Sequence, residues 1–115
     1  MTAERIPQSI SHWIPVMTQR IIDQFEPSQI ILFGSHARGD AQPHSDIDLL
    51  VVFPEVESKR QQAIAIRSIL TDLPVAKDII VTTPQEIEEY GDMVGTVLRP
   101  ALREGQLLYD RSANL

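Results

Sequence analysis

The sequence predicts an α/β fold, a small sheet of about four strands flanked by helices, and two observations predict it. Segments whose apolar residues recur at helical spacing alternate along the chain with short apolar runs bounded by glycine, proline and polar residues. The 115 residues suit one domain, residues 1–115, and 43% of them are hydrophobic, a normal fraction for a globular protein. We therefore expect one domain with a buried core rather than a disordered chain.

The first half of the chain is expected to hold one long helix and two strands. Apolar residues at helical spacing predict a helix from Ser9 to Phe25, with a kink or a start near Pro15, because proline cannot donate a backbone hydrogen bond inside a helix. The apolar runs Gln29–Phe33 and Asp46–Phe53 predict strands. Between them, residues 34–45 contain two glycines, a proline and polar residues, which predicts a loop with room for a short helix.

The third strand is expected to lie between two helices. Helical spacing of apolar residues predicts a helix over Ser58–Leu73, and Val75–Val81 reads as a strand bounded by prolines. The tetrapeptide Thr83–Glu86 has a capping threonine, a proline in the first helical position and a glutamate three residues after the cap. It therefore predicts a helix start.

The C-terminal segment is expected to end in a short strand. Apolar residues over 94–102 predict that the helix continues or restarts after Gly91, with a bend at Pro100. Gly105 is a natural helix terminator. Gln106–Tyr109 then predicts a final strand, followed by a tail.

Composition excludes several classes of protein. Without cysteine the chain cannot be a disulfide scaffold, hold a Cys-based zinc site or use a thiol nucleophile. The net charge is −6, from 10 Lys and Arg against 16 Asp and Glu, so direct nucleic-acid binding is disfavoured. We see no secretory signal, and the apolar runs are far shorter than the roughly 20 residues of a membrane-spanning helix. We expect a soluble, cytoplasmic protein with no membrane association.

Two aspartates at the start of the second strand form the first candidate site. Strand side chains alternate, so Asp46 and Asp48 should point to the same side, where their charges repel each other unless a cation lies between them. Carboxylate oxygens with open positions suit Mg²⁺, which takes part of its shell from phosphates. The alternative is structural: Asp46 caps a turn and Asp48 is solvated at a strand end.

Upstream of the aspartates, the first strand ends in a turn suited to phosphate. Gly34 lets the backbone approach an anion closely, and amides around such a turn can hold phosphate oxygens. The Ser35 hydroxyl adds a donor and Arg38 adds a positive charge suited to phosphate. An ordinary tight turn with a solvated arginine is the alternative.

Gly34–Asp40 followed by Ser45–Leu49 resembles the signature of the DNA polymerase beta-like nucleotidyltransferase superfamily, and within it the minimal nucleotidyltransferase (MNT) subgroup. The resemblance extends over about residues 25–110 and implies that superfamily's fold, with a small mixed sheet. The family uses a third carboxylate on a later strand, and Asp78 is the match. Its alternative is a strand-edge aspartate paired with Lys77 or Arg67.

The resemblance implies a chemistry for these residues. Asp46, Asp48 and Asp78 would hold Mg²⁺, as a two-ion site, and would be the catalytic carboxylates, with Asp78 also accepting a proton from the attacking hydroxyl. Gly34 and Ser35 would hold the phosphates of ATP. Arg38 would support either the loop or the phosphates.

MNT domains resemble the antitoxin half of modules whose other half is an all-helical HEPN toxin. This resemblance implies AMP transfer from ATP to a tyrosine of the toxin within a hetero-oligomer. Two alternatives stay open: a non-catalytic antitoxin that inhibits by occlusion, and a small-molecule nucleotidyltransferase. His36 and His44 flank the phosphate loop, where each could contact a ligand or lie in solvent.

Overall fold

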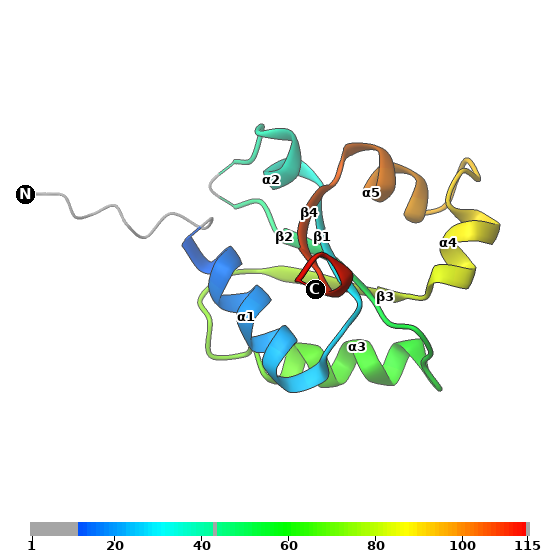
Figure 1. Ribbon diagram of the computed structural model, residues 1–115. Coiled ribbons are helices and arrows are strands. Elements are labelled where there is room, and N and C mark those ends of the chain that lie inside the picture. Colours follow the sequence, from blue (N-terminus) through cyan, green and yellow to red (C-terminus); the bar gives the residue numbers. More distant parts are fainter. Residues whose placement is uncertain (1–11, 43, 115) are drawn as a thin grey trace, which may run out of the picture.

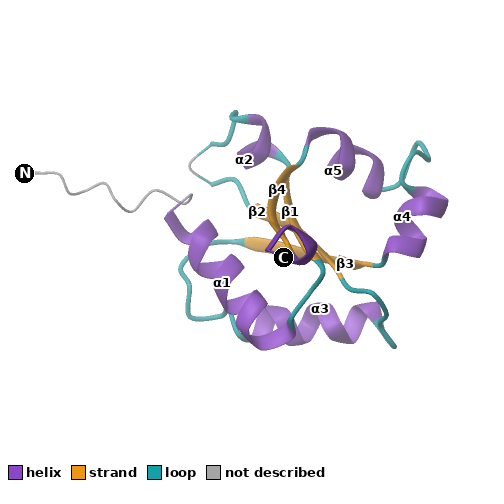
Figure 2. Cartoon of the chain, viewed as in Figure 1, coloured by secondary structure: helices purple, strands orange, loops and turns teal. Residues whose placement is uncertain are grey.

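The computed structural model describes residues 12–42 and 44–114, and Figures 1 and 2 show their arrangement. A mixed sheet of four strands lies between two groups of helices, which confirms the predicted fold class. In chain order the elements are α1 (Trp13–Phe25), β1 (Gln29–Phe33), α2 (Ser35–Arg38), β2 (Ile47–Val52), α3 (Lys59–Ser68), β3 (Lys77–Thr82), α4 (Pro84–Tyr90), α5 (Leu98–Glu104), β4 (Gln106–Asp110) and a 3-10 turn (Arg111–Asn114).

The strand order is β3-β2-β1-β4. Strand β1 pairs antiparallel with both β2 and β4, whereas β2 and β3 run parallel. The parallel pair is joined by α3, as a crossover connection requires. The two central strands are the most deeply buried, and β3 and β4 form the edges.

Alternation along the strands divides the core into two layers. On one face, strand residues such as Leu32, Leu49 and Ile79 pack with apolar residues of α1 and α3, among them Met17 and Ile66. On the other face a smaller cluster, composed of strand residues and residues of α5, contains Ile31, Phe33, Leu50, Leu98 and Ala101. Figure 1 shows α1 and α3 below the sheet and α2, α4 and α5 above it. A residue of β1, β2 or β3 can therefore be assigned to a face by its place in the alternation, whereas the register of β4 against β1 shifts between Ile30 and Ile31.

Helix α1 begins at Trp13, so Pro15 lies in its first turn, where a missing N–H costs nothing. This confirms a start near Pro15. The predicted positions 9–11 lie outside the described residues. The helix ends at Phe25, and the capping residue Glu26 adopts a left-handed conformation (φ 51°) and donates its N–H to the Ile22 carbonyl. That turn leads the chain directly into β1.

Helix α3 is shorter than predicted, because it ends at Ser68 instead of Leu73. The apolar spacing continues past the helix, since Leu70 and Leu73 remain buried within turns. Strand β3 correspondingly starts at Lys77 rather than at Val75. Apolar spacing records which residues face the core, and here the core extends beyond the helix end.

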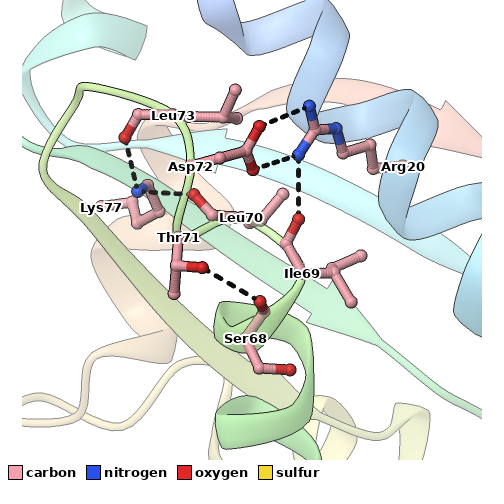
Figure 3. Close-up of polar contacts among 8 residues, drawn as sticks. All are labelled: Arg20, Ser68, Ile69, Leu70, Thr71, Asp72, Leu73 and Lys77. Atoms are coloured by element: carbon pink, nitrogen blue, oxygen red, sulfur yellow. Dashed lines mark hydrogen bonds and ion pairs between the residues drawn. The ribbon is translucent and has the colours of Figure 1, made fainter.

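Polar contacts fix this short connection between α3 and β3 (Figure 3). Arg20 of α1 donates to both carboxylate oxygens of Asp72, at 2.6 and 3.1 Å, and to the Ile69 carbonyl at 3.0 Å. Lys77 donates to the carbonyls of Leu70 and Leu73 at 3.0 and 3.3 Å. The connection thus sets where β3 begins, and Lys77 points toward the side of α3.

The C-terminal segment departs most from the prediction. Val94 and Val97 are 77% and 44% exposed and lie outside the helices, which restart only at Leu98. Pro100 is the third residue of α5, so the expected bend there is wrong for the same reason that Pro15 is tolerated. The expected tail begins with the 3-10 turn Arg111–Asn114. The start of α4 is as predicted, because the Thr83 hydroxyl accepts the Glu86 N–H.

Within the described residues, we find no helix that combines the length and apolar character needed to cross a bilayer.

Candidate active site

The candidate residues meet at the end of the sheet where β1 finishes and β2 and β3 begin. Phe33 of β1 pairs with Asp48 of β2, and Asp48 pairs in register with Asp78 of β3. Residues paired in register project to the same face, so both aspartates lie on the face covered further along by α5. The strands therefore bring Gly34, Asp48 and Asp78 to one level of the sheet and place the two aspartates on the same face.

The Asp48 carboxylate packs directly against the backbone of Gly34. A Cβ atom placed on Gly34 would lie 2.2 Å from Oδ2 of Asp48, which is far inside contact distance. The backbone there has φ 77° and ψ −158°, a region used almost only by glycine. The need for glycine thus has a reason that the sequence did not show: the nearest group in the structure is a protein carboxylate.

Asp48 is half-buried among like charges. Burial is the largest cause that raises its pKa, followed by the negative charges of Asp78 and Asp46. His36 and Arg38 lower the pKa of Asp48 by a smaller amount. A carboxylate whose surroundings oppose its charge is stabilised when a cation binds beside it.

Asp46 lies just outside the strand, because β2 starts at Ile47, and its side chain is exposed. It is close enough to affect the pKa of Asp48. In the described part of the chain, however, no group of three or more acidic or histidine side chains is arranged to hold a metal ion. The structure brings Asp48 and Asp78 together, and it leaves Asp46 at the margin.

Asp78 has a cationic partner. Arg67 Nη2, at the end of α3, donates to Asp78 Oδ1 at 3.3 Å, with side chains 53% and 45% exposed respectively. The other partner considered, Lys77, is occupied by the carbonyls of Leu70 and Leu73 (Figure 3). The sequence alone could not decide between these two cations.

The donor chemistry of the site fits a hard divalent cation. Asp48 and Asp78 supply carboxylate oxygens in register on adjacent strands, and Asp46 stands at the entrance. Oxygen donors with open positions are what Mg²⁺ prefers. The three aspartates could hold such an ion once Asp46 and Asp78 turn toward Asp48, which their exposure permits.

The loop after β1 begins with the one-turn helix α2. The Gly34 carbonyl accepts hydrogen bonds from the amides of Ala37 and Arg38, at 3.1 Å each. Ser35 is the first residue of α2, and its carbonyl accepts the N–H of Gly39 at 3.0 Å. Because the first amides of a helix have no partner within it, this turn can offer N–H donors beside the Ser35 hydroxyl.

Arg38 is engaged in holding the loop. It forms ion pairs with Asp40 at 3.3 Å and with Glu104 of α5 at 3.4 Å. Gln106 of β4 also donates to the Ala37 carbonyl at 2.8 Å. In the structure Arg38 thus contacts one carboxylate of the loop and one of α5.

The two histidines that flank the loop differ in their contacts. The His36 ring lies 3.3 Å through Nε2 from the Ser45 carbonyl and so bridges the two ends of the loop. His44 is exposed. The bridging contact of His36 had no signal in the sequence, because it depends on how the loop closes.

Comparison with known proteins places this geometry in a family. A family model described as "Nucleotidyltransferase domain" matches residues 17–107. The chain belongs to the nucleotidyltransferase domain family. The matched range includes the whole of the candidate site, strands β1 to β3 and the first two residues of β4.

Three relatives of this nucleotidyltransferase domain are informative. A Methanocaldococcus jannaschii protein, named as a candidate protein adenylyltransferase, is 33% identical over 73 residues, 55% of this chain and 74% of that protein. A candidate nucleotidyltransferase from Sulfolobus solfataricus has a similar crystal structure, with TM-score 0.58, 22% identity, and 84% and 77% of the two chains covered. A doubly substituted MntA–HpeT toxin–antitoxin structure gives TM-score 0.62 at 16% identity, with coverage of 87% and 75%. The two structures confirm the nucleotidyltransferase fold.

Proposed function

We propose that this nucleotidyltransferase domain transfers AMP from ATP to a tyrosine of a HEPN-type toxin and acts as the toxin's antitoxin. The observation that carries the proposal is the register of Asp48 with Asp78 beside the turn at Gly34 and Ser35. That arrangement places acidic ligands for a cation next to donors for phosphate, which is the combination that nucleotidyl transfer needs.

Each residue has a role in the proposed reaction. Asp46, Asp48 and Asp78 would hold Mg²⁺, in a two-ion site, and bound ions would offset negative charge on the α-phosphoryl group and on the leaving group. Ser35 and the amides near Gly34 would bind the β- and γ-phosphates. The ion pairs of Arg38 keep the loop in place for that contact.

The proposed step is a displacement at the α-phosphorus of ATP. The tyrosine oxygen forms a bond to the α-phosphorus while the bond from that phosphorus to the bridging oxygen breaks, and pyrophosphate leaves. Asp78 is the group proposed to accept the hydroxyl proton. It is half-exposed at the edge of the sheet, where an incoming protein side chain could reach it.

The relatives support a nucleotide substrate and a protein acceptor. The M. jannaschii relative is named for protein adenylyl transfer, and a further similar structure, with TM-score 0.58 and 19% identity, is a toxin–antitoxin solved with AMP-PNP. The two substitutions in the MntA–HpeT structure replace aspartates two positions apart, the spacing of Asp46 and Asp48. Inhibition of a toxin inside the cell that makes it would place the protein in the cytoplasm.

The test is to purify the chain with the product of the neighbouring gene, add ATP and Mg²⁺, and measure intact masses. A partner heavier by one or more AMP units, with no gain for an Asp48→Asn control, is the expected result. A tight complex without mass change would overturn AMP transfer and support an antitoxin that acts by occlusion. Transfer to a small hydroxylated compound without a partner would replace the protein acceptor with a small-molecule one.

The occlusion alternative has two observations in its favour. Asp78 is already paired with Arg67, and no three-carboxylate cluster is assembled in the described residues. An Asp78→Ala variant separates the two functions, because it should keep the complex with the toxin but lose transfer.

A further inference from the structure

Arg67 reaches the candidate site from the opposite side of the sheet. It lies in the last turn of α3, and α3 packs through Ile66 against the face that also contains Ile79. Asp78 belongs to the other face, with Asp48. Because β3 is an edge strand, the Arg67 side chain can pass around the edge and place Nη2 3.3 Å from Asp78 Oδ1.

The ion pair between Arg67 and Asp78 is weak. It consists of a single 3.3 Å contact, and both side chains are about half exposed. Pairs with this exposure change an equilibrium by less than about fivefold, because water screens the charges and the long side chains lose freedom. By contrast, Arg20 and Asp72 nearby form two contacts at 2.6 and 3.1 Å.

Arg67 and a divalent cation would compete for the same carboxylate. Asp78 lies in register with Asp48, whose surroundings are already crowded with negative charge. The Arg67 guanidinium offsets part of that charge when no metal is bound. A doubly charged ion bound to Asp78 would repel the guanidinium and take over its oxygen.

We propose that Arg67 is a positioning residue that holds the Asp78 carboxylate in the metal-free protein and is displaced when a divalent cation binds. Arg67 thereby weakens the affinity of the site for the metal and sets the metal concentration at which the site fills. The inference rests on the proposed function, because it takes Asp48 and Asp78 as metal ligands.

The experiment is a titration of the full chain with Mn²⁺ in the absence of nucleotide. Binding is monitored through the electron paramagnetic resonance signal of free aqueous Mn²⁺. Arg67→Gln should bind Mn²⁺ about threefold to tenfold more tightly than the wild type, because it removes both a competitor and a like charge. Arg60→Gln is the matched control. It removes one positive charge from the same helix about two turns away, roughly a Debye length, and should change the affinity by less than about twofold.

Two further variants keep the test sharp. Arg67→Lys retains the charge without the planar guanidinium, so its affinity should lie between those of wild type and Arg67→Gln. In an Asp78→Asn background, Arg67→Gln should change Mn²⁺ affinity much less than in the wild type, since the contested carboxylate is gone and only the removal of a like charge remains. A merely structural role for Arg67 would change thermal stability but would not tighten metal binding.

The possible failures are distinguishable. If Asp48→Asn binds Mn²⁺ as well as the wild type, the metal site of the proposed function is wrong. If Asp48→Asn loses Mn²⁺ but the two Arg67 variants bind it equally or more weakly than wild type, only the inference on Arg67 is overturned.

Discussion

Replacement of Gly34 by alanine tests whether a glycine is needed here to leave room for the Asp48 carboxylate. The new methyl group would lie 2.2 Å from Oδ2 of Asp48, so the carboxylate must move. The backbone at φ 77° and ψ −158° also disfavours any side chain, at a cost of about 1–3 kcal/mol. Turning Asp48 away from its preferred rotamer adds about 0.5–1.5 kcal/mol.

Gly39 provides the matched control. It also has a positive φ, 86°, but a Cβ placed there has no atom within 4 Å. Gly39→Ala should therefore lower the free energy of unfolding only by the cost of a left-handed conformation, about 1–2 kcal/mol. We expect a loss of about 2–4 kcal/mol for Gly34→Ala, which corresponds to a fall in Tm of roughly 8–16 °C at about 4 °C per kcal/mol.

Urea denaturation of both variants, alone and combined with Asp48→Ala, measures the two contributions separately. Truncating Asp48 removes the atom that the new methyl group meets, so it should restore about 0.5–1.5 kcal/mol to Gly34→Ala and nothing to Gly39→Ala. Equal losses for the two glycine variants, or no coupling between Gly34→Ala and Asp48→Ala, would refute the reasoning.

Three further predictions concern the candidate site. Asp48→Asn should raise stability at about pH 7, because burial and the charges of Asp78 and Asp46 raise the pKa of Asp48 in the native state. The free energy of unfolding of the wild type therefore falls as the pH rises from the pKa of Asp in the unfolded chain, about 3.9, through the native pKa. Urea midpoints should show that the stability advantage of Asp48→Asn shrinks toward about pH 4. Ser35→Ala should weaken binding of a non-hydrolysable ATP analogue by about 1.5–3 kcal/mol in calorimetry, and unchanged affinity would place the triphosphate elsewhere. Asp78→Ala should abolish AMP transfer while sparing most ATP affinity, and near-normal transfer would remove Asp78 from the proposed mechanism.

Local sequence patterns predicted the two central strands well because β1 and β2 are almost completely buried. Gln29–Phe33 is an apolar run whose last four residues are all buried, and β1 has those bounds. The start of α4 was predictable because the Thr83 cap is a local hydrogen bond. The helix predicted over residues 94–102 starts later than expected. Val94 and Val97 have helical spacing, but they are exposed, and Gly95 between them adopts φ 96°, which interrupts a helix.

The candidate site was predictable only where it depends on strand alternation. The shared face of Asp48 and Asp78 follows from period two plus adjacent strands. The sequence left two candidate cations for Asp78, Lys77 and Arg67, and the packing of α3 brings Arg67 to it. The contact of Arg38 with Glu104 had no local signal, because it depends on the packing of α5. The contact between Gly34 and Asp48 could not be predicted, because it depends on the pairing of β1 with β2, which no local pattern encodes.

The position of β1 between β2 and β4 has a consequence for synthesis of the chain. One edge of β1 is covered early by β2, but the other must wait for Gln106–Asp110, made roughly seventy residues later, several seconds at about 5–20 residues per second. During that interval the apolar segment Gln29–Phe33 presents an open edge that can pair with strands of other chains. A chain truncated before Gln106 should therefore aggregate rather than persist as a smaller soluble domain.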